Sequence, residues 1–150
     1  MSTNEAVSTL LNRLNDLKER INCEFVSIAL VDNDSGMMKW RWAWGNLNDR
    51  YLFIEHRPNH GLSGQVMKIG RGIAWQRKEL EEKRLLNEYS IMLVERLQSV
   101  YAVPVKVKVN TKFVGVLLIG DRTEQVYDQL VRDSVNEAAD QVGEIVSNLL

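Results

Sequence analysis

The chain has 150 residues, with 19 basic and 20 acidic side chains. This length suits one domain, residues 1–150, with enough chain to bury a sizeable core. The nearly balanced charge provides no basic field that would attract nucleic acid or a membrane surface. Cys23 is the single cysteine, which excludes an intramolecular disulfide and a thiolate metal cluster. Because the chain has no long apolar run and its N-terminus lacks a signal-peptide pattern, we expect a cytoplasmic protein.

Both ends of the chain have the periodicity of amphipathic helices. Apolar residues recur at spacings of three and four over about 4–22 and again over about 124–149. Each apolar stripe has two possible partners, the sheet of the same chain or a second copy of the chain. A homodimer formed through the terminal helices is therefore one hypothesis.

Six segments between these helices have the composition of strands and are bounded by turn residues. They cover residues 25–31, 37–44, 50–55, 73–75, 99–109 and 112–120. Residues 77–98 predict a surface helix, a loop near 87–90 and a second helical piece. Because hairpins dominate the order, we expect an α+β fold with a mainly antiparallel sheet of about five to six strands and helices packed on it.

Three tryptophans occupy alternate positions of the second predicted strand, at Trp40, Trp42 and Trp44. Side chains of a strand repeat every two residues, so the pattern predicts that all three rings line one face. An alternative for Trp42 and Trp44 is plain packing in the core or at an interface.

A glycine-rich turn at Gly61–Gly64 leads into a short predicted helix. The first N–H groups of a helix have no partner within it, and its dipole favours negative charge. Glycine also lets the backbone approach a ligand closely. The turn and the aromatic strand together predict a pocket for something small, planar or negatively charged. The alternative is that the turn only connects a strand to a helix.

Other reactive side chains offer weaker signals. His56 and His60 lie four residues apart in a proline-containing loop without a third clustered ligand, so we expect no metal site. Cys23 has no visible neighbour that would activate it as a nucleophile. We therefore expect no catalytic residues, and a protein that is not an enzyme.

Motifs over most of the chain resemble GAF domains. They are G-L-S-G-Q-V at 61–66 with I-G-R-G at 69–72, A-V-P-V at 102–105, and V-G-V-L-L-I-G at 114–120. The resemblance runs from about Cys23 to the C-terminus. It implies a GAF-like antiparallel central sheet with the N- and C-terminal helices packed on one face. GAF domains bind many ligands, so the fold alone gives no function.

A narrower resemblance rests on K-W-R-W-A-W-G-N-L-N-D-R-Y at 39–51, G-L-S-G at 61–64, and E-Y-S-I at 88–91 before L-Q-S-V-Y-A-V-P. These segments resemble the stand-alone nitrate-receptor GAF proteins of the NreA type. Such proteins bind nitrate in a small closed pocket and modulate a sensor histidine kinase of a two-component system that controls nitrate respiration. The resemblance implies nitrate as the ligand, no cofactor, and a histidine kinase as the partner.

The resemblance also implies a set of ligand-binding residues. Carried over by motif and by the glycine turn, they are Trp40, Leu62, Ser63, Gly64, Tyr89 and Ile91. Ser90 stands where the family has a proline, and a serine there adds a backbone N–H.

Nitrate needs N–H donors more than a formal countercharge, because it is singly charged, weakly hydrated and rich in acceptor oxygens. Micromolar affinity requires about 8 kcal/mol, whereas a helix dipole contributes about 2 kcal/mol. Each charge-assisted hydrogen bond adds about 1.5 to 3 kcal/mol. Several amides must therefore converge, with the Trp40 indole or the Tyr89 hydroxyl as additional donors. Apolar walls from Leu62 and Ile91 would exclude water and would penalise a doubly charged ion such as sulfate.

Three other functions are alternatives to nitrate sensing. Some small GAF proteins reduce free methionine sulfoxide, but that chemistry uses several cysteines and this chain has one. A different small effector is possible, although the cyclic-nucleotide signature and a chromophore cysteine are both missing. The remaining alternative is a ligand-free dimerisation module whose pocket is filled by its own side chains.

Overall fold

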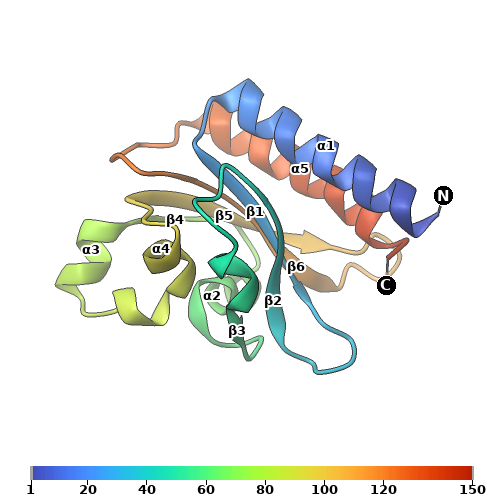
Figure 1. Ribbon diagram of the computed structural model, residues 1–150, viewed down its shortest axis with the longest axis horizontal. Helices are drawn as coiled ribbons and strands as arrows, with labels where there is room; N and C mark the ends of the chain where they lie inside the picture. The colour runs from blue at the N-terminus through green and yellow to red at the C-terminus, as the bar shows by residue number, and fades with distance from the viewer. Residues whose placement is uncertain (1, 150) are drawn as a thin grey trace.

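The computed structural model describes residues 2–149, which form a layered α+β fold around a six-stranded sheet (Figure 1). The strands are β1 (Phe25–Val31), β2 (Met38–Trp44), β3 (Glu55–His56), β4 (Ile73–Gln76), β5 (Ser99–Lys106) and β6 (Phe113–Asp121). The helices are α1 (Thr3–Ile21), α2 (Gly61–Ile69), α3 (Arg77–Glu82), α4 (Ser90–Val94) and α5 (Gln129–Val146), with 3₁₀ turns η1 (Arg50–Phe53) and η2 (Leu86–Glu88). Strand order is β3-β2-β1-β6-β5-β4, and neighbouring strands are antiparallel. The predicted fold class is confirmed.

The terminal helices α1 and α5 lie side by side on one face of the sheet (Figure 1). Side chains cap both N-termini: Ser2 accepts a hydrogen bond from the Glu5 amide, and Asp128 accepts one from the Val131 amide. Asn22 ends α1 in the left-handed conformation. The apolar stripes of both helices pack on the sheet in a helix-side core that includes Leu10, Leu14, Leu17, Ile28, Leu117, Val135, Val142 and Val146.

Short helices and turns cover the opposite face of the sheet, where α2, α3, α4, η1 and η2 lie (Figure 1). Their buried residues form a pocket-side core that includes Phe25, Ala29, Trp40, Leu62, Val66, Ile91, Leu97 and Leu118. The central strand β1 is buried over almost its whole length because it contributes side chains to both cores. The sheet thus separates a layer of two long helices from a layer of short segments.

A β-bulge in β2 overturns the prediction that three tryptophans share one face. Trp42 pairs with Ile28 and Trp40 with the next residue, Ala29, which leaves Arg41 without a partner on β1. The extra residue reverses the alternation of side chains at that point. Trp40 therefore lies in the pocket-side core, whereas Trp42 packs against the helix-side core. The alternative stated for Trp42, packing in the core, agrees with this position.

The third predicted strand, over about 50–55, is wrong in its extent. Residues 50–53 form the 3₁₀ turn η1, and only Glu55 and His56 pair with β2. The Asn48 side chain accepts a hydrogen bond from the Arg50 amide at 2.8 Å and thereby favours a turn. Phe53 is 85% exposed, so the segment lacks the alternating burial that a strand needs.

The C-terminal helix begins at Gln129, later than the predicted residue of about 124. Hydrogen bonds hold the preceding segment in a loop: Ser99 donates to the Thr123 carbonyl at 2.9 Å, and Tyr127 donates to the Asp121 carboxylate at 2.9 Å. The helix starts where the side chain of Asp128 supplies a cap.

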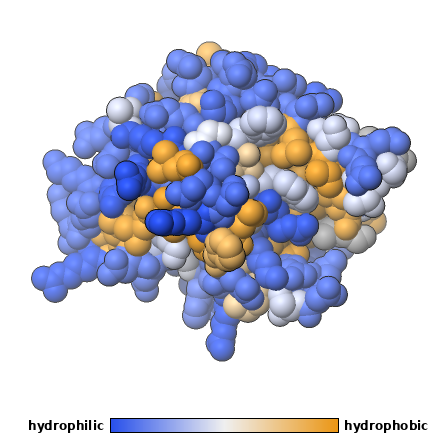
Figure 2. Space-filling model, in the orientation of Figure 1, coloured by the Kyte–Doolittle hydropathy of each residue, from blue (hydrophilic) through white to orange (hydrophobic). Residues whose placement is uncertain are grey.

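Hydrophobic residues reach the surface in several places between larger hydrophilic areas (Figure 2). The most exposed large ones are Phe53, Val109, Val126 and Leu130. Within the described residues, no helix combines the length and the apolar character needed to span a bilayer.

Candidate functional site

An inner cavity of about 10 Å³ lies on the pocket side of the sheet, between the N-termini of α2 and α4. It is lined by Trp40, Ile54, His56, Gly61, Leu62, Ser63, Glu88, Ser90 and Ile91. A volume of this size is about that required by one water molecule. The inner cavity is therefore a small, tightly walled hollow.

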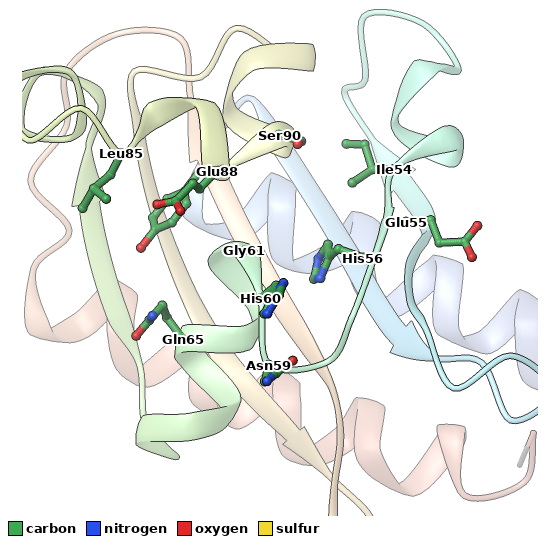
Figure 3. Close-up of a pocket in the computed structure, with 11 residues that line it drawn as sticks. Ile54, Glu55, His56, Asn59, His60, Gly61, Gln65, Leu85, Glu88 and Ser90 are labelled. Atoms are coloured by element: carbon green, nitrogen blue, oxygen red, sulfur yellow. The ribbon is translucent and has the colours of Figure 1, made fainter.

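An outer pocket of about 450 Å³ adjoins it and shares five lining residues with it (Figure 3). The shared residues are Ile54, His56, Gly61, Glu88 and Ser90, and those added by the outer pocket include Asn59, His60, Gln65, Leu85 and Tyr89. The two spaces meet where β3, the α2 turn and η2 come together. The outer pocket falls within the range of volumes that small ligands occupy.

Free backbone N–H groups stand at the start of α2. The first helical hydrogen bond runs from the Gly64 amide to the His60 carbonyl at 3.1 Å. The preceding amides, those of Gly61, Leu62 and Ser63, have no backbone acceptor within residues 2–149, and His60 supplies no side-chain cap. All three of those residues line the inner cavity. The helix N-terminus thus combines unpaired donors with the positive end of its dipole.

Glycine is required at two positions of this turn for different reasons. Gly61 has a φ of +70°, a conformation that other residues rarely adopt. At Gly64, a Cβ would lie 2.5 Å from the carbonyl carbon of Asn59. Gly64 lines neither the inner cavity nor the outer pocket, and its amide is already bonded. Its place in the structure is close packing of the turn, which differs from the ligand contact predicted for it.

Two aromatic side chains contribute further donors. Trp40 is 2% exposed and lines the inner cavity, and within residues 2–149 its indole N–H makes no hydrogen bond. Tyr89 lines the outer pocket, with its ring edge-on to Trp75 at a centroid distance of 5.3 Å. Burial raises the pKa of Tyr89, and the Glu88 carboxylate raises it further. The Tyr89 hydroxyl therefore keeps its hydrogen at neutral pH and remains a donor.

The charges near the inner cavity are sparse. Among the residues that the structure describes, no lysine or arginine lines it. Arg41 lies instead over the ring of Trp42, at 4.8 Å from its centroid. Glu88 is the acidic residue of the lining, and it is exposed. An anion in this cavity would depend on N–H and O–H donors.

His56 is a lining residue that the sequence did not single out as a ligand contact. Its Nε2 lies 2.9 Å from Ser63 Oγ, and its Nδ1 lies 2.8 Å from the Arg57 carbonyl oxygen. The sequence showed only a histidine near the glycine turn. The contact with Ser63 depends on how β3 and α2 meet in space.

The six predicted ligand-binding residues therefore fall into three groups. Trp40, Leu62, Ser63 and Ile91 line the inner cavity, Tyr89 lines the outer pocket, and Gly64 lines neither. Ser90 begins α4, a position where proline is also accommodated, so the exchange fits the backbone. Its own N–H has no backbone acceptor within residues 2–149.

The single cysteine, Cys23, lies outside this region in an apolar environment. Cys23 is buried in the helix-side core, where burial and then the Asp121 carboxylate raise the pKa of its thiol to about 12. A thiol with such a pKa stays protonated and is a poor nucleophile. Within residues 2–149, no group of three histidine, cysteine, aspartate or glutamate side chains is placed to hold a metal ion.

Comparison with solved structures finds two similar proteins of Staphylococcus aureus. A mutated NreA, altered in its nitrate binding site, is 27% identical, with 85% of this chain and 96% of that chain covered at a TM-score of 0.75. A hypothetical protein is 32% identical, with 78% of this chain and 95% of that chain covered at a TM-score of 0.68. The sequence matches no protein-family model and no curated protein.

More distant structures share the fold alone. The GAF domain of a two-component sensor histidine kinase from Bacillus halodurans is 18% identical, covering 99% of this chain and 96% of that chain at a TM-score of 0.71. A free methionine-R-sulfoxide reductase from Neisseria meningitidis is 19% identical, covering 95% of this chain and 78% of that chain at a TM-score of 0.74. The sheet, the terminal helices and these similarities agree: the chain belongs to the GAF domain family and has a fold close to that of NreA.

Proposed function

We propose that the protein is a sensor that binds nitrate in the inner cavity. The observation that carries the proposal is the set of free amides at Gly61, Leu62 and Ser63, which border a small cavity walled by Trp40 and Ile91. Three charge-assisted hydrogen bonds at about 1.5 to 3 kcal/mol each, with about 2 kcal/mol from the helix dipole, give about 6.5 to 11 kcal/mol, a range that includes the roughly 8 kcal/mol of micromolar binding. The 27% identity to NreA supports nitrate as the first candidate among small anions.

Nitrate is larger than water, so the inner cavity must widen when the ion enters. The walls able to move are the short segments, because η2 and α4 carry Glu88, Ser90 and Ile91. A ligand that favours the widened state shifts the protein toward it. Binding would thereby change the outer surface of α4, which is a route by which a partner can read the ligand.

Titration calorimetry with nitrate, nitrite, chloride and sulfate tests the ligand directly. We expect heat with nitrate, none with sulfate, and a rise in melting temperature at millimolar nitrate. Tryptophan fluorescence should change as well, since Trp40 borders the cavity. Unchanged melting temperature and fluorescence at millimolar nitrate would contradict the proposal.

The partner that we propose is a sensor histidine kinase of a two-component system. NreA is a structural relative, and GAF domains of sensor histidine kinases share the fold. Ligand control then requires a different affinity of the kinase for the nitrate-bound and nitrate-free protein. Co-purification with the cognate kinase, with and without nitrate, measures this difference. Equal association with and without nitrate would show that the protein binds the kinase but that nitrate does not control the binding.

A second candidate function is the binding of a larger effector in the outer pocket. The volume of about 450 Å³ and the Tyr89 hydroxyl favour it. Asn59→Ala and Gln65→Ala alter the outer pocket without touching the lining of the inner cavity. If a larger effector loses affinity for these variants while nitrate still binds to them, the outer pocket is the binding site of that effector.

We also propose that the protein forms a homodimer through the terminal helices. Leu130 at the start of α5 is 78% exposed, which leaves apolar surface on a helix whose inner stripe is already buried. Sedimentation analysis at high micromolar concentration should show a dimer that Leu130→Glu weakens. A monomer at that concentration would remove the dimer from consideration.

A further inference from the structure

Both ring nitrogens of His56 have partners, and these partners limit where its hydrogens are placed. A carbonyl oxygen only accepts hydrogen bonds, so Nδ1, at 2.8 Å from the Arg57 carbonyl, carries a hydrogen. Nε2 lies 2.9 Å from the hydroxyl of Ser63, a group that either donates or accepts. The charge of His56 therefore decides which group donates across this contact.

In the neutral ring, Nε2 is an acceptor and the Ser63 hydroxyl hydrogen is directed at His56. Ser63 then turns only lone pairs toward other neighbours, and lone pairs repel an anion. In the charged ring, Nε2 donates to Ser63 Oγ, which frees the hydroxyl hydrogen to point elsewhere. Ser63 has no exposed surface and lines the inner cavity, so the freed hydrogen can point into that cavity.

We propose that His56 and Ser63 form a proton-linked part of the anion site, so that the inner cavity takes up protons when it takes up an anion. The inference rests on the proposed function, because it concerns the same cavity. Charged His56 would supply the positive charge that lysine and arginine do not supply among the described lining residues. By linkage, an anion that favours the charged ring must bind more tightly when the ring is charged.

Other titratable groups surround His56 and must be separated from it. Glu55 precedes it on β3, and Lys39 on β2 lies opposite Glu55. Arg57 follows His56 in the chain, and His60 and Glu88 line the outer pocket with it. Figure 3 shows the His56 ring beside Gly61, where its Nε2 lies 3.4 Å from the position a Cβ would take. Of these other groups, Glu88 alone also lines the inner cavity, and its charge opposes an anion.

The test is nitrate calorimetry between about pH 5 and 8, the range in which histidine changes its charge, repeated in two buffers of different ionisation enthalpy. We expect nitrate to bind about tenfold more tightly at the acidic end, with proton uptake that peaks at about half a proton per ion within this range and falls off on either side. His56→Gln should bind nitrate with the same affinity across the range. Ser63→Ala, which keeps the backbone amide, should lose affinity mainly at the acidic end.

Two control variants separate His56 from its neighbours. His60→Gln makes the same exchange in the other histidine, which makes no hydrogen bond with Ser63 in residues 2–149, and it should keep the pH dependence. Glu88→Gln should raise affinity at all pH values while retaining the dependence. The melting temperature of each variant confirms that it is folded.

The outcomes distinguish the two proposals. Nitrate binding with one affinity at all pH values, or a dependence that persists in His56→Gln, would overturn the proton linkage and leave the nitrate site standing. The absence of heat with nitrate at every pH in the folded wild type would overturn both.

Discussion

The tryptophans on the two faces of the sheet differ in the partners of their side chains. On the helix side, Trp44 donates its indole N–H to the Leu11 carbonyl at 2.8 Å, and Trp42 is covered by Arg41. On the pocket side, Trp40 is more deeply buried than Trp44, yet its indole N–H has no acceptor among the described residues. Among the described residues, the fully buried side-chain atom without a partner is Glu95 Oε2, so the Trp40 N–H keeps some accessible surface and is free to pair with a ligand or water. The helix side is built for stability, whereas the pocket side retains unused donors.

The covering segments differ in the same way. Two helices of 19 and 18 residues cover the helix side. Apart from Trp40, Ile54 and His56, the walls of the inner cavity come from a nine-residue helix, a five-residue helix and a 3₁₀ turn. Short segments bury fewer apolar contacts each, so they open at lower free-energy cost. Variants on the two faces should therefore separate stability from ligand binding.

The largest effect on binding is expected from Leu62→Asp. A carboxylate about 4 Å from a bound anion repels it by about 4 kcal/mol at an effective dielectric constant of about 20, which weakens binding about a thousandfold. Calorimetry with nitrate measures the loss. Leu62 is 2% exposed, so the fold of the variant must be checked, and Leu62→Asn serves as the uncharged control. Retained affinity would place the anion elsewhere.

The largest effect on stability is expected on the helix side. Leu14 of α1 is 1% exposed, and Leu14→Ala should lower the free energy of unfolding by about 2 to 5 kcal/mol through loss of packing. Its nitrate affinity should stay the same. Ile91→Ala on the pocket side should enlarge the inner cavity and change nitrate affinity at a smaller cost in stability. Chemical denaturation measures the stability of both variants, and calorimetry measures their nitrate affinity. Equal changes in nitrate affinity would contradict the separation of stability and binding between the two faces.

A smaller effect is expected from exchanging single tryptophans. Trp40→Phe removes an indole donor worth about 1.5 to 3 kcal/mol to an anion, so nitrate should bind at least about tenfold more weakly. The fluorescence response to nitrate should also disappear. Trp44→Phe removes the bond to Leu11 and should cost about 1 kcal/mol of stability while the fluorescence response persists. If the fluorescence response to nitrate were lost in Trp44→Phe and kept in Trp40→Phe, the signal would come from the helix side of the sheet, which would contradict the proposed site.

The smallest effect is a pH dependence of stability from Glu95, at the end of α4. Its Oε1 accepts hydrogen bonds from the Leu47 amide at 2.9 Å and from Arg122 at 2.7 Å, while its Oε2 has no partner among the described residues. Burial raises the pKa of Glu95 although those donors oppose the shift. The carboxyl thus contributes stability below the pKa of the unfolded chain and loses it as pH rises through the folded pKa.

Glu95→Gln should therefore flatten the decline of melting temperature between about pH 4 and 7 relative to the wild type. Asp32 offers a contrast of opposite sign, because hydrogen bonding to Lys39 lowers its pKa to about 2. The Asp32 side chain is partly accessible to water, which screens the ion pair and keeps its contribution small. A steeper decline in Glu95→Gln would show that the ion pair with Arg122 outweighs burial.

The periodic parts of the chain were predictable from sequence. Leu10, Leu14 and Leu17 recur at helical spacing and do line the buried face of α1. The hairpin of β5 and β6 was predicted, and Thr111 in its turn has a φ of +54°, but the strands end at Lys106 and resume at Phe113, so the connection is longer than the predicted Asn110–Thr111 pair. The glycine turn at Gly61 was also recognisable, because a positive φ and a helix start leave local signatures. These features depend on residues that are near neighbours in the chain.

Tertiary structure decided the rest, since it depends on segments that the sequence does not place together. The bulge at Arg41 arises from pairing with β1, so no alternation rule within β2 could assign Trp40 and Trp42 to opposite faces. The contact of His56 with Ser63 requires β3 and α2 to meet at hydrogen-bond distance. Local spacing therefore determined which donors the chain offers, and packing across the sheet determined which of them share one small cavity.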